Sequence, residues 1–216
     1  MTKKPRKDRG IFISFEGPEG CGKTTQISKI SALLEEAGNK VLVTREPGGT
    51  EIGEEIRHLL MHSTANANMF PETELLLFTA SRAQLVREVI IPKIEEGSFV
   101  LCDRFLDSTT VYQGAARKLA ENAVHMINTF AVGNLMPDLT IILDIPVEVG
   151  LHRIKHRASE IPDRMEKETL EFYHAVREGY LLLAKSLPDR FLIVDGTLPE
   201  EKITATIWNE LEKRFG

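Results

Sequence analysis

Cysteine is scarce in this chain, and long apolar runs are missing from it. The 216 residues include two cysteines, Cys21 and Cys102, which are too few for the disulfide framework of a small secreted protein. No apolar stretch approaches the roughly 18 residues that a membrane-spanning helix needs. We therefore expect a cytoplasmic protein that has no membrane partner.

Positive net charge is also lacking. The formal net charge is −5, whereas proteins that bind nucleic acid or anionic membranes usually carry clustered positive charge, so a small-molecule partner and no nucleic acid are expected. The opening MTKKPRKDRG is basic, but a strand-like IFISF follows it in place of the apolar core of a signal peptide. We expect residues 1–10 to be a flexible, solvated tail, with a nucleic-acid-binding arm as the alternative.

Five short runs rich in β-branched and aromatic residues alternate with longer helical patterns. The runs are IFISFE (11–16), VLVTRE (41–46), SFVLCD (98–103), LTIILD (139–144) and FLIVD (191–195). Helical spacing fills the segments between them, including residues 72–97, and Gly38 and Gly97 stand where two helical patterns stop. This alternation predicts an α/β fold, with three α/β/α layers and a parallel sheet of about five strands, in a single domain over residues 11–216.

The segment FEGPEGCGKTTQ (15–26) joins the first strand-like run to a helical pattern. It contains the phosphate-binding pattern G-x-x-x-x-G-K-[ST] in the strand–helix context that this pattern requires. Backbone N–H groups and the helix N-terminus would bind phosphate, Lys23 would reach the terminal phosphates of ATP, and Thr24 would offer a hydroxyl to Mg²⁺. We therefore predict a P-loop NTPase fold whose nucleotide-binding segment consists of Gly17, Pro18, Glu19, Gly20, Cys21, Gly22, Lys23, Thr24 and Thr25.

Polar residues elsewhere help to decide between a switch, a motor and a kinase. The guanine-reading N-K-x-D motif and the D-x-x-G motif of GTPase switches do not occur, and a mechanical ATPase would need a longer chain. Arginines follow or adjoin most of the predicted strands, and one phosphate donor does not need so many. A second anionic substrate, and hence a phosphotransferase, is indicated by Arg45, Arg82, Arg104, Arg153, Arg157 and Arg164.

Five segments together resemble the thymidylate kinases, which phosphorylate dTMP to dTDP. They are FEGPEGCGKTTQ, TREPGGT (44–50), LFTASRAQ (77–84), CDRFLDSTTVYQG (102–114) and DRME (163–166). The P-loop is shared by many families, whereas R-E-P-G-G-T and D-R-[FY]-x-x-S-x-x-x-Y-Q at this spacing are specific. The resemblance covers nearly the whole chain and implies an enzyme of dTTP synthesis, with ATP and Mg²⁺ as cofactors, dTMP as substrate and a homodimer packed through long helices.

Transfer between two nucleotides requires that phosphate charge be cancelled. The acceptor oxygen is already anionic, since the second phosphate pKa is about 6, so no general base is needed. Asp103, at the end of a predicted strand, suits Mg²⁺ or its water shell with Thr24 opposite, and a helix N-cap is the alternative. By resemblance, Arg45 and Arg104 clamp the acceptor phosphate with their planar guanidinium groups, and surface salt bridges are the alternative.

A small helical lid is predicted over residues 152–166, where helical spacing breaks and basic residues flank a Ser-Glu-Ile-Pro turn. In the family that the chain resembles, the basic residue at the transferred phosphoryl comes either from the P-loop or from the lid. The P-loop offers Glu19 in place of an arginine, so the resemblance is to the bacterial type and assigns transition-state charge to Arg153, with Arg157 and Arg164 as further candidates. A solvated helix end is the alternative, because basic residues favour helix C-termini.

The helix that carries Phe78 and Arg82 is expected to recognise the base, as the resemblance to the family implies. These residues lie four apart and would share one helix face, although periodicity alone would make Phe78 a core residue. The resemblance places Phe78 against the thymine ring, Arg82 at its carbonyl edge and Tyr112 against the sugar. It also assigns substrate binding to Glu46, Ser108, Thr109 and Gln113.

Two other functions stay open. A deoxynucleoside kinase would need a carboxylate base close to the sugar, which Glu46 could supply. A non-catalytic P-loop switch would bind the nucleotide alone, although the missing guanine motif and the second arginine cluster count against it. In the favoured interpretation, catalysis depends on Lys23, Asp103, Arg104 and Arg153. We also expect thiol reagents to inactivate the protein, because Cys21 lies near a helix N-terminus, which lowers a thiol pKa.

Overall fold

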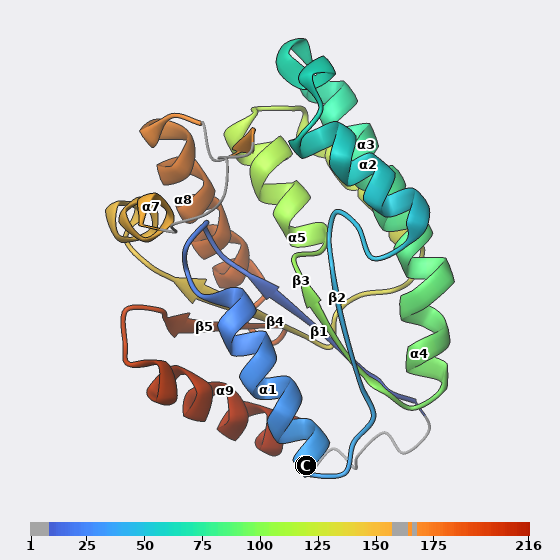
Figure 1. The fold of residues 1–216 in the computed structure, drawn as a ribbon, viewed down its shortest axis with the longest axis vertical. Helices are drawn as coiled ribbons and strands as arrows, with labels where there is room; N and C mark the ends of the chain where they lie inside the picture. The colour runs from blue at the N-terminus through green and yellow to red at the C-terminus, as the bar shows by residue number, and fades with distance from the viewer. Residues whose placement is uncertain (1–8, 157–163, 166–167) are drawn as a thin grey trace.

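The computed structural model describes residues 9–156, 164–165 and 168–216. These residues contain a five-stranded parallel sheet in the order β2-β3-β1-β4-β5 (Figure 1). The strands are Ile11–Glu16 (β1), Val41–Arg45 (β2), Phe99–Asp103 (β3), Leu139–Asp144 (β4) and Phe191–Asp195 (β5). Each strand agrees with a predicted run to within one residue, which confirms the α/β class and the parallel sheet.

The central strand β1 is buried on both faces of the sheet. Successive side chains of a strand point to opposite faces, and those of β1 enter two different core clusters. Ile13 and Phe15 of β1 belong to one core cluster, whereas Phe12 of the same strand packs in another. The first cluster also holds side chains from residues 27–34 and 203–211, and the second holds side chains from residues 85–94 and Val132. Burial on two faces therefore explains why apolar residues in β1 do not alternate with polar ones.

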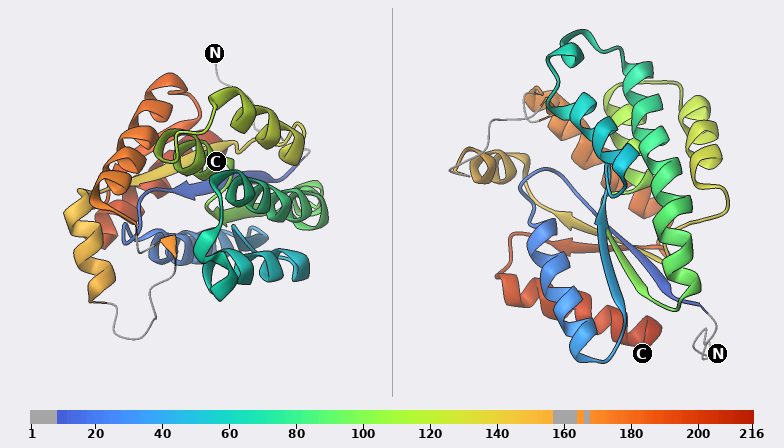
Figure 2. Two further views of the ribbon diagram at one scale, coloured as in Figure 1. Left: turned by 90° about the horizontal axis from the view of Figure 1, so that it is seen from above. Right: turned by 45° about the vertical axis from the view of Figure 1, so that its right-hand side comes forward.

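Helices form a layer on each face. α1 (Lys23–Glu36) and α9 (Glu200–Phe215) lie side by side on one face, and helices that include α3, α5 and α8 lie on the other (Figures 1 and 2). This arrangement confirms the three predicted layers. Besides α1 and α9, the helices and helical turns of the described residues are α2 (Glu51–Met61), η1 (Thr64–Asn68), α3 (Pro71–Leu85), η2 (Val86–Ile90), α4 (Ile91–Glu95), α5 (Leu106–Thr109), η3 (Thr110–Ala116), α6 (Glu121–Val132), α7 (Val147–Lys155) and α8 (Leu170–Ser186).

The helix predicted over residues 72–97 is continuous but not uniform. A π-helical turn, η2, joins α3 to α4, and the N–H of Ile91 donates to the carbonyl of Val86, five residues earlier. The next residue, Pro92, has no N–H to donate, so a regular α-helical hydrogen bond is missing there. The chain leaves this helix at Gly97 and leaves α1 at Gly38, both with positive φ, as predicted.

Two segments of the predicted domain organisation, the tail and the lid, fall partly outside the described residues. Residues 1–8 of the expected tail are not described, and its last two residues are anchored, because Arg9 pairs with Asp138 at 2.5 Å and the Gly10 N–H donates to Ile94 O. Residues 157–163 and 166–167 of the expected lid region are also outside the description. Within the part that is described, no helix is long and apolar enough to cross a membrane.

The sheet order brings a set of polar residues to one edge. β1 lies between β3 and β4, so the chain reverses its direction of winding beside β1, and ligands of such folds bind at the carboxyl ends of the strands at this point. Asp103 ends β3 in register with Phe15 of β1 and with Arg45 of β2. The site is therefore expected where these strands end.

Candidate active site

The P-loop connects β1 to α1 and lies tightly against neighbouring backbone. Gly20 has a φ of 73°, and a Cβ atom built on it would lie 2.6 Å from the carbonyl oxygen of Gly150 in α7. A side chain at this position would therefore be strained and would also push α7 away. No side chain of the described residues caps the first turn of α1, so its N–H groups are available to an anion, as the sequence predicted.

Lys23 lies over this loop. Its Nζ donates to the carbonyl oxygens of Gly17 and Pro18, both at 3.2 Å, and lies 3.5 Å from Cys21 Sγ. The residue is mostly buried and lines the larger of two cavities. A bound phosphate would give the ammonium group a stronger acceptor than these neutral carbonyls.

Thr24 and Asp103 meet across the mouth of the same cavity. Thr24 Oγ1 donates to Asp103 Oδ2 at 3.2 Å. The described residues contain no group of three or more His, Cys, Asp or Glu side chains that could hold a metal. A hydroxyl and a carboxylate suit Mg²⁺, which keeps several waters and takes its other ligands from phosphates. The residues present therefore fit a magnesium ion that arrives with a nucleotide.

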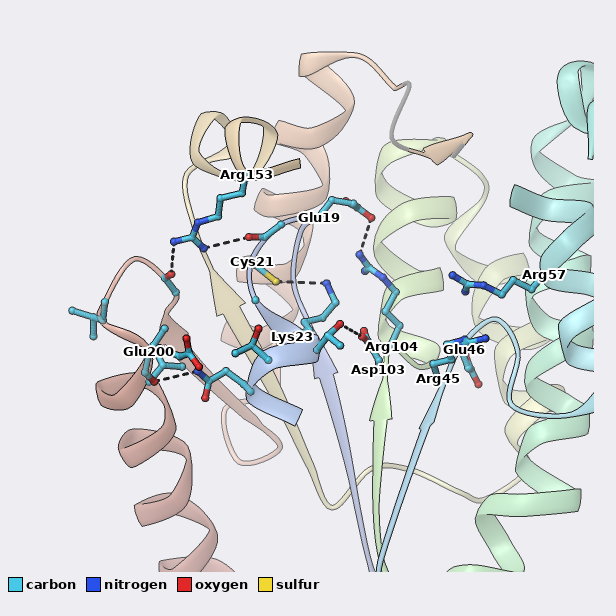
Figure 3. A pocket seen from close by; sticks show the side chains of 18 residues that line it. Glu19, Cys21, Lys23, Arg45, Glu46, Arg57, Asp103, Arg104, Arg153 and Glu200 are labelled. Atoms are coloured by element: carbon cyan, nitrogen blue, oxygen red, sulfur yellow. Dashed lines mark hydrogen bonds and ion pairs between the residues drawn. The ribbon is translucent and has the colours of Figure 1, made fainter. Parts of the chain in front are cut away.

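Two adjoining cavities share four charged side chains. The larger cavity, about 650 Å³, runs along the P-loop and past Gly196 and Leu198 (Figure 3). The smaller, about 100 Å³, is lined by Phe78, Thr109, Tyr112 and Gln113. Because the cavities have common lining residues, ligands bound in them would meet. The shared charged residues are Glu19, Glu46, Arg57 and Arg104.

Arg104 is held in place from three directions. Its backbone has a φ of 69°, which is uncommon for a residue with a side chain and marks local strain at the end of β3. Its guanidinium donates to Glu19 at 2.7 Å and to the hydroxyls of Ser108 and Tyr180, both at 3.2 Å. The predicted clamp residue is thus fixed at the junction of the two cavities, with Ser108 serving as one of its supports.

The comparisons with known proteins agree with this geometry. A family model described as thymidylate kinase matches residues 15–207. The chain belongs to the thymidylate kinase family. The thymidylate kinase of Geobacter sulfurreducens is 53% identical over 191 residues, 87% of this chain and 89% of the relative. That of Deinococcus radiodurans is 46% identical over 206 residues, 95% of this chain and 98% of the relative.

Membership of the thymidylate kinase family confirms the resemblance that the motifs indicated. It makes the chain a phosphotransferase and implies a nucleotide phosphate donor. The match to the family assigns no role to an individual side chain, and the geometry around each one decides what it can bind.

Arg45 and Arg57 both lie on the wall of the larger cavity in this thymidylate kinase fold. The predicted Arg45 is half exposed and pairs with Glu54 at 2.9 Å. Arg57, which the sequence reasoning missed, also lines the smaller cavity, and it donates to the carbonyl oxygen of Pro47 at 3.0 Å. Arg57 lies inside α2 and not at the end of a strand, so the positions of the predicted strands do not indicate it. The sequence signal that indicates Arg57 is its position seven residues, about two helical turns, after Thr50, the N-cap of α2.

Arg82 lies behind the wall of the smaller cavity rather than in it. Its side chain is 1% exposed and has four acceptors, which belong to different segments. The guanidinium binds Glu46 Oε2, with Nε at 2.7 Å, and donates to Thr109 Oγ1 at 3.0 Å. It also donates to Asn128 Oδ1 at 2.7 Å and to Phe105 O at 3.2 Å. Direct contact with the base stays a prediction, and the contacts described here make Arg82 a support for Glu46 and Thr109.

Two buried carboxylates support the floor of the site. Burial raises the pKa of Glu46 to about 7 against the opposing charge of Arg82, and Glu46 Oε1 has no hydrogen-bond partner among the described residues. Burial, helped by Asp107, also raises the pKa of Glu16 to about 7, although Arg104, Ser108 and Tyr180 oppose it. Glu16 accepts from Phe105 N at 2.7 Å and from Ser108 Oγ at 2.6 Å.

The two candidate lid arginines that the structure describes, Arg153 and Arg164, lie apart. Arg153 donates to Gly20 O at 3.2 Å and to Gly196 O at 3.3 Å, on the far side of the P-loop from Arg104 (Figure 3). Arg164 pairs with Glu74, behind the smaller cavity. Arg157 lies outside the described residues. A contact between Arg153 and the transferred phosphoryl stays a prediction, and Arg164 is occupied elsewhere.

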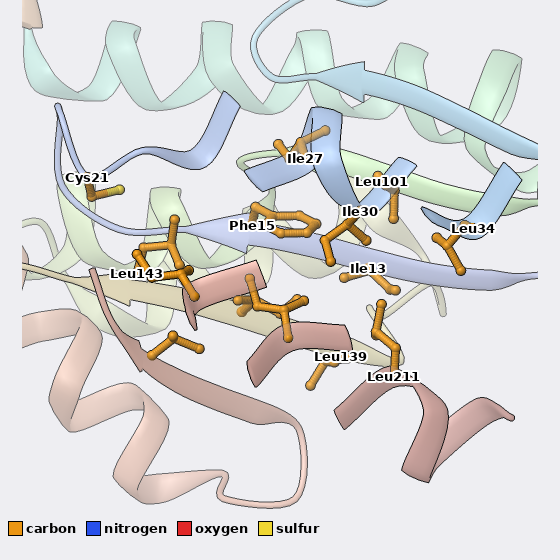
Figure 4. Packing of buried hydrophobic residues seen from close by; sticks show 14 of the residues in the cluster. Ile13, Phe15, Cys21, Ile27, Ile30, Leu34, Leu101, Leu139, Leu143 and Leu211 are labelled. Carbon is orange, nitrogen blue, oxygen red and sulfur yellow. The ribbon is translucent and has the colours of Figure 1, made fainter. Parts of the chain in front are cut away.

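The surroundings of Cys21 bear on the expected attack by thiol reagents. Its side chain is 1% exposed and belongs to the core cluster between the sheet and α1 (Figure 4). The residue also lines the larger cavity, and its Sγ lies 3.5 Å from Lys23 Nζ. Burial of the side chain counts against rapid attack by a thiol reagent, and inactivation of the protein by such a reagent stays a prediction.

Proposed function

We propose that the chain transfers the γ-phosphoryl group of ATP to dTMP, giving dTDP and ADP. The observation that carries this proposal is the pair of adjoining cavities, one lined by the P-loop and the other by Phe78, Thr109 and Gln113, with Arg57 and Arg104 common to both. Triphosphate in the first cavity and monophosphate in the second would meet at these arginines. Membership of the thymidylate kinase family supports dTMP as the acceptor.

The reaction needs position and positive charge rather than a base. An oxygen of the dTMP phosphate attacks the γ-phosphorus, the bond from that phosphorus to the β,γ-bridging oxygen breaks, and ADP leaves with the electron pair. Lys23 would bind the donor phosphates, and Arg104 and Arg45 the acceptor phosphate, with Arg57 added to this clamp. The Glu19–Arg104 pair at 2.7 Å would hold the clamp before the substrate arrives.

A magnesium ion would be held by Thr24 and Asp103 together with phosphate oxygens. When bound, Mg²⁺ supplies positive charge to the donor phosphates and lowers the repulsion between the two nucleotides. The hydrogen bond from Thr24 to Asp103 already brings the two oxygen atoms to 3.2 Å. The protein's part is therefore to present one hydroxyl and one carboxylate at the phosphate end of the cavity.

The lid and the single-domain organisation are part of the same proposal. We assign the lid to residues 152–166, with Arg153 at the transferred phosphoryl and Arg157 as the further candidate. Arg153 already lies on the wall of the larger cavity, which supports a role toward the donor nucleotide. Residues 11–216 would then form one kinase domain, and we place the enzyme in the cytoplasm.

We also propose that the enzyme is a homodimer. Met126 and Phe130 lie four residues apart on α6 and are 65% and 83% exposed, and Leu76 is exposed on the neighbouring α3. Large apolar side chains that share an exposed helix face are typical of interaction surfaces. A second copy of this chain fits the helix-packed dimer that the resemblance implies.

The test is an assay of ADP release with ATP, Mg²⁺ and a panel of acceptors. We expect dTMP to be the best acceptor, dUMP to be poorer by roughly 10–200-fold because a pocket for one methyl group discriminates weakly, and dCMP and AMP to be almost inert. Equal use of AMP or dCMP would refute the assignment.

A deoxynucleoside kinase is the second candidate. Glu46 Oε1 is buried and unpartnered among the described residues, and Glu46 lines both cavities, so it could accept a proton from a sugar hydroxyl. Thymidine in the same panel separates the two, since this candidate requires thymidine to be phosphorylated faster than dTMP.

A further inference from the structure

Glu74 is a buried carboxylate that the proposed chemistry does not use. It lies on α3, is 1% exposed and does not line either cavity. Its oxygens accept from Gln113 Nε2 at 2.7 Å, from Arg117 at 3.3 Å and from Arg164. Two segments of the chain, η3 with its C-cap Arg117 and the segment that holds Arg164, therefore converge on one carboxylate behind the smaller cavity.

The carboxylate stays ionised in this surrounding. Burial by itself would raise the pKa of Glu74, but the hydrogen bond from Gln113 and the charges of Arg117 and Arg164 together hold the pKa below its ordinary value. An ionised carboxylate only accepts hydrogen bonds, so the group of Gln113 that faces it must be the amide NH₂. The orientation of the Gln113 amide is thus set by Glu74 and not by the ligand.

This orientation decides what the smaller cavity offers to a base. Because the NH₂ end of the amide is turned to Glu74, which lies behind the cavity, the carbonyl end of Gln113 is turned away from that carboxylate, and Oε1 accepts from no side chain of the described residues. Thr109, on the same cavity, accepts from Arg82 Nη1 at 3.0 Å, so its own hydroxyl hydrogen is left to donate. The cavity therefore presents one fixed acceptor and one fixed donor.

We propose that Glu74 is a specificity-determining positioning residue, which makes the enzyme accept thymine and reject cytosine by fixing Gln113 as an acceptor. The inference rests on the proposed use of dTMP. Thymine carries an N3–H donor between two carbonyl acceptors and matches this pattern. Cytosine has an acceptor at N3 and an amino donor beside it, so it meets Gln113 Oε1 and Thr109 with the wrong polarity, which leaves buried polar groups unpaired.

Glu74→Gln tests the proposal. The variant keeps the size of the side chain, and its one carbonyl oxygen would accept from an arginine. Its NH₂ could then donate to Gln113 Oε1, which lets the Gln113 amide rotate and present its NH₂ to the cavity. We expect kcat/KM for dTMP to fall while that for dCMP rises or holds, so that the dTMP/dCMP ratio drops by about 10-fold or more. The matched control is Glu168→Gln, which removes a carboxylate from the same Arg117 without touching Gln113, and its ratio should stay at the wild-type value.

An equal loss of activity with both nucleotides in Glu74→Gln would overturn the proposal, since it would reduce Glu74 to a structural role. If the variant does not fold, the side-chain NH₂ of Gln113 is followed by NMR in ¹⁵N-labelled wild type. Slow exchange with solvent, unchanged by dTMP, is expected, and fast exchange or release on adding dTMP would contradict the proposal. Wild-type turnover of dTMP reports separately on the proposed function.

Discussion

Lys23 is the residue whose place in the structure agrees most directly with the sequence pattern. Lys23→Ala should lower kcat for dTMP phosphorylation by about 10²–10³-fold, because a charge aimed at the donor phosphates is lost. The folded state should survive, since Nζ touches only loop carbonyls and a thiol. Steady-state kinetics with thermal unfolding as the control would check this, and near-normal turnover would remove the P-loop from the mechanism.

Tyr112 has a second task that its motif did not reveal. Its hydroxyl donates to both oxygens of Glu19, at 2.9 and 2.8 Å, and Glu19 in turn holds Arg104. Tyr112→Phe keeps the ring that we expect to lie against the sugar but removes one of the donors to Glu19, which stays paired with Arg104. We expect kcat/KM for dTMP to fall by about 10-fold, the cost of a typical hydrogen bond to a charged group, while the preference for dTMP over its ribonucleotide is kept.

The preference should be measured as the ratio of kcat/KM for the two nucleotides. A variant that accepts the ribonucleotide as well as dTMP would show that the hydroxyl, rather than the bulk of the ring, excludes the 2′-OH.

At this scale the sequence predicts which residues carry charge but not what they bind in the folded chain. Thr24 and Asp103 were predicted to face each other, and they do, because strand ends and a fixed motif place both. Arg82 is held by protein partners, because a buried guanidinium must be paired, and the partly buried Ser108 hydroxyl donates to Glu16. Arg57 carried no strand-end signal.

The strands and most helices could be predicted because both depend on local periodicity. Five apolar runs bounded by polar residues predict the five strands, and Gly38 and Gly97 predict two helix ends. The π-helical turns η2 and η3 could not be predicted in this way, because a hydrogen bond between residues five apart has no signature in the spacing of apolar residues.

The place of α7 against the P-loop depends on two glycines. A Cβ atom on Gly150 would lie 2.6 Å from the carbonyl oxygen of Glu19, so Gly150→Ala should push the elements apart. We expect a loss of about 1–3 kcal/mol in the free energy of unfolding and weaker binding of ATP, although alanine favours a helix. Urea denaturation and calorimetric titration with ATP would measure both.

Gly114→Ala is the control for this prediction, because a Cβ there meets only Val124 Cγ1 at 4.0 Å. That variant should be as stable as wild type or slightly more stable. A Gly150→Ala protein of unchanged stability and affinity would show that α7 is free to move away from the P-loop.

For the whole molecule, the proposed dimer makes a separate prediction. Phe130→Glu places a charge in the centre of the exposed face of α6 and should convert the dimer to a monomer in analytical ultracentrifugation. Leu182→Glu, at a 60% exposed position of α8, is the control and should leave the dimer intact. A wild-type protein that sediments as a monomer at micromolar concentration would refute the dimer.

The central claim is that phosphate moves from ATP to the phosphate of dTMP. The most direct measurement is ³¹P NMR of the wild-type enzyme mixed with ATP, Mg²⁺ and dTMP. The account predicts that the resonances of dTDP and ADP grow together in equal amounts while those of dTMP and ATP decline. Formation of ADP with inorganic phosphate while dTMP stays unchanged would contradict it.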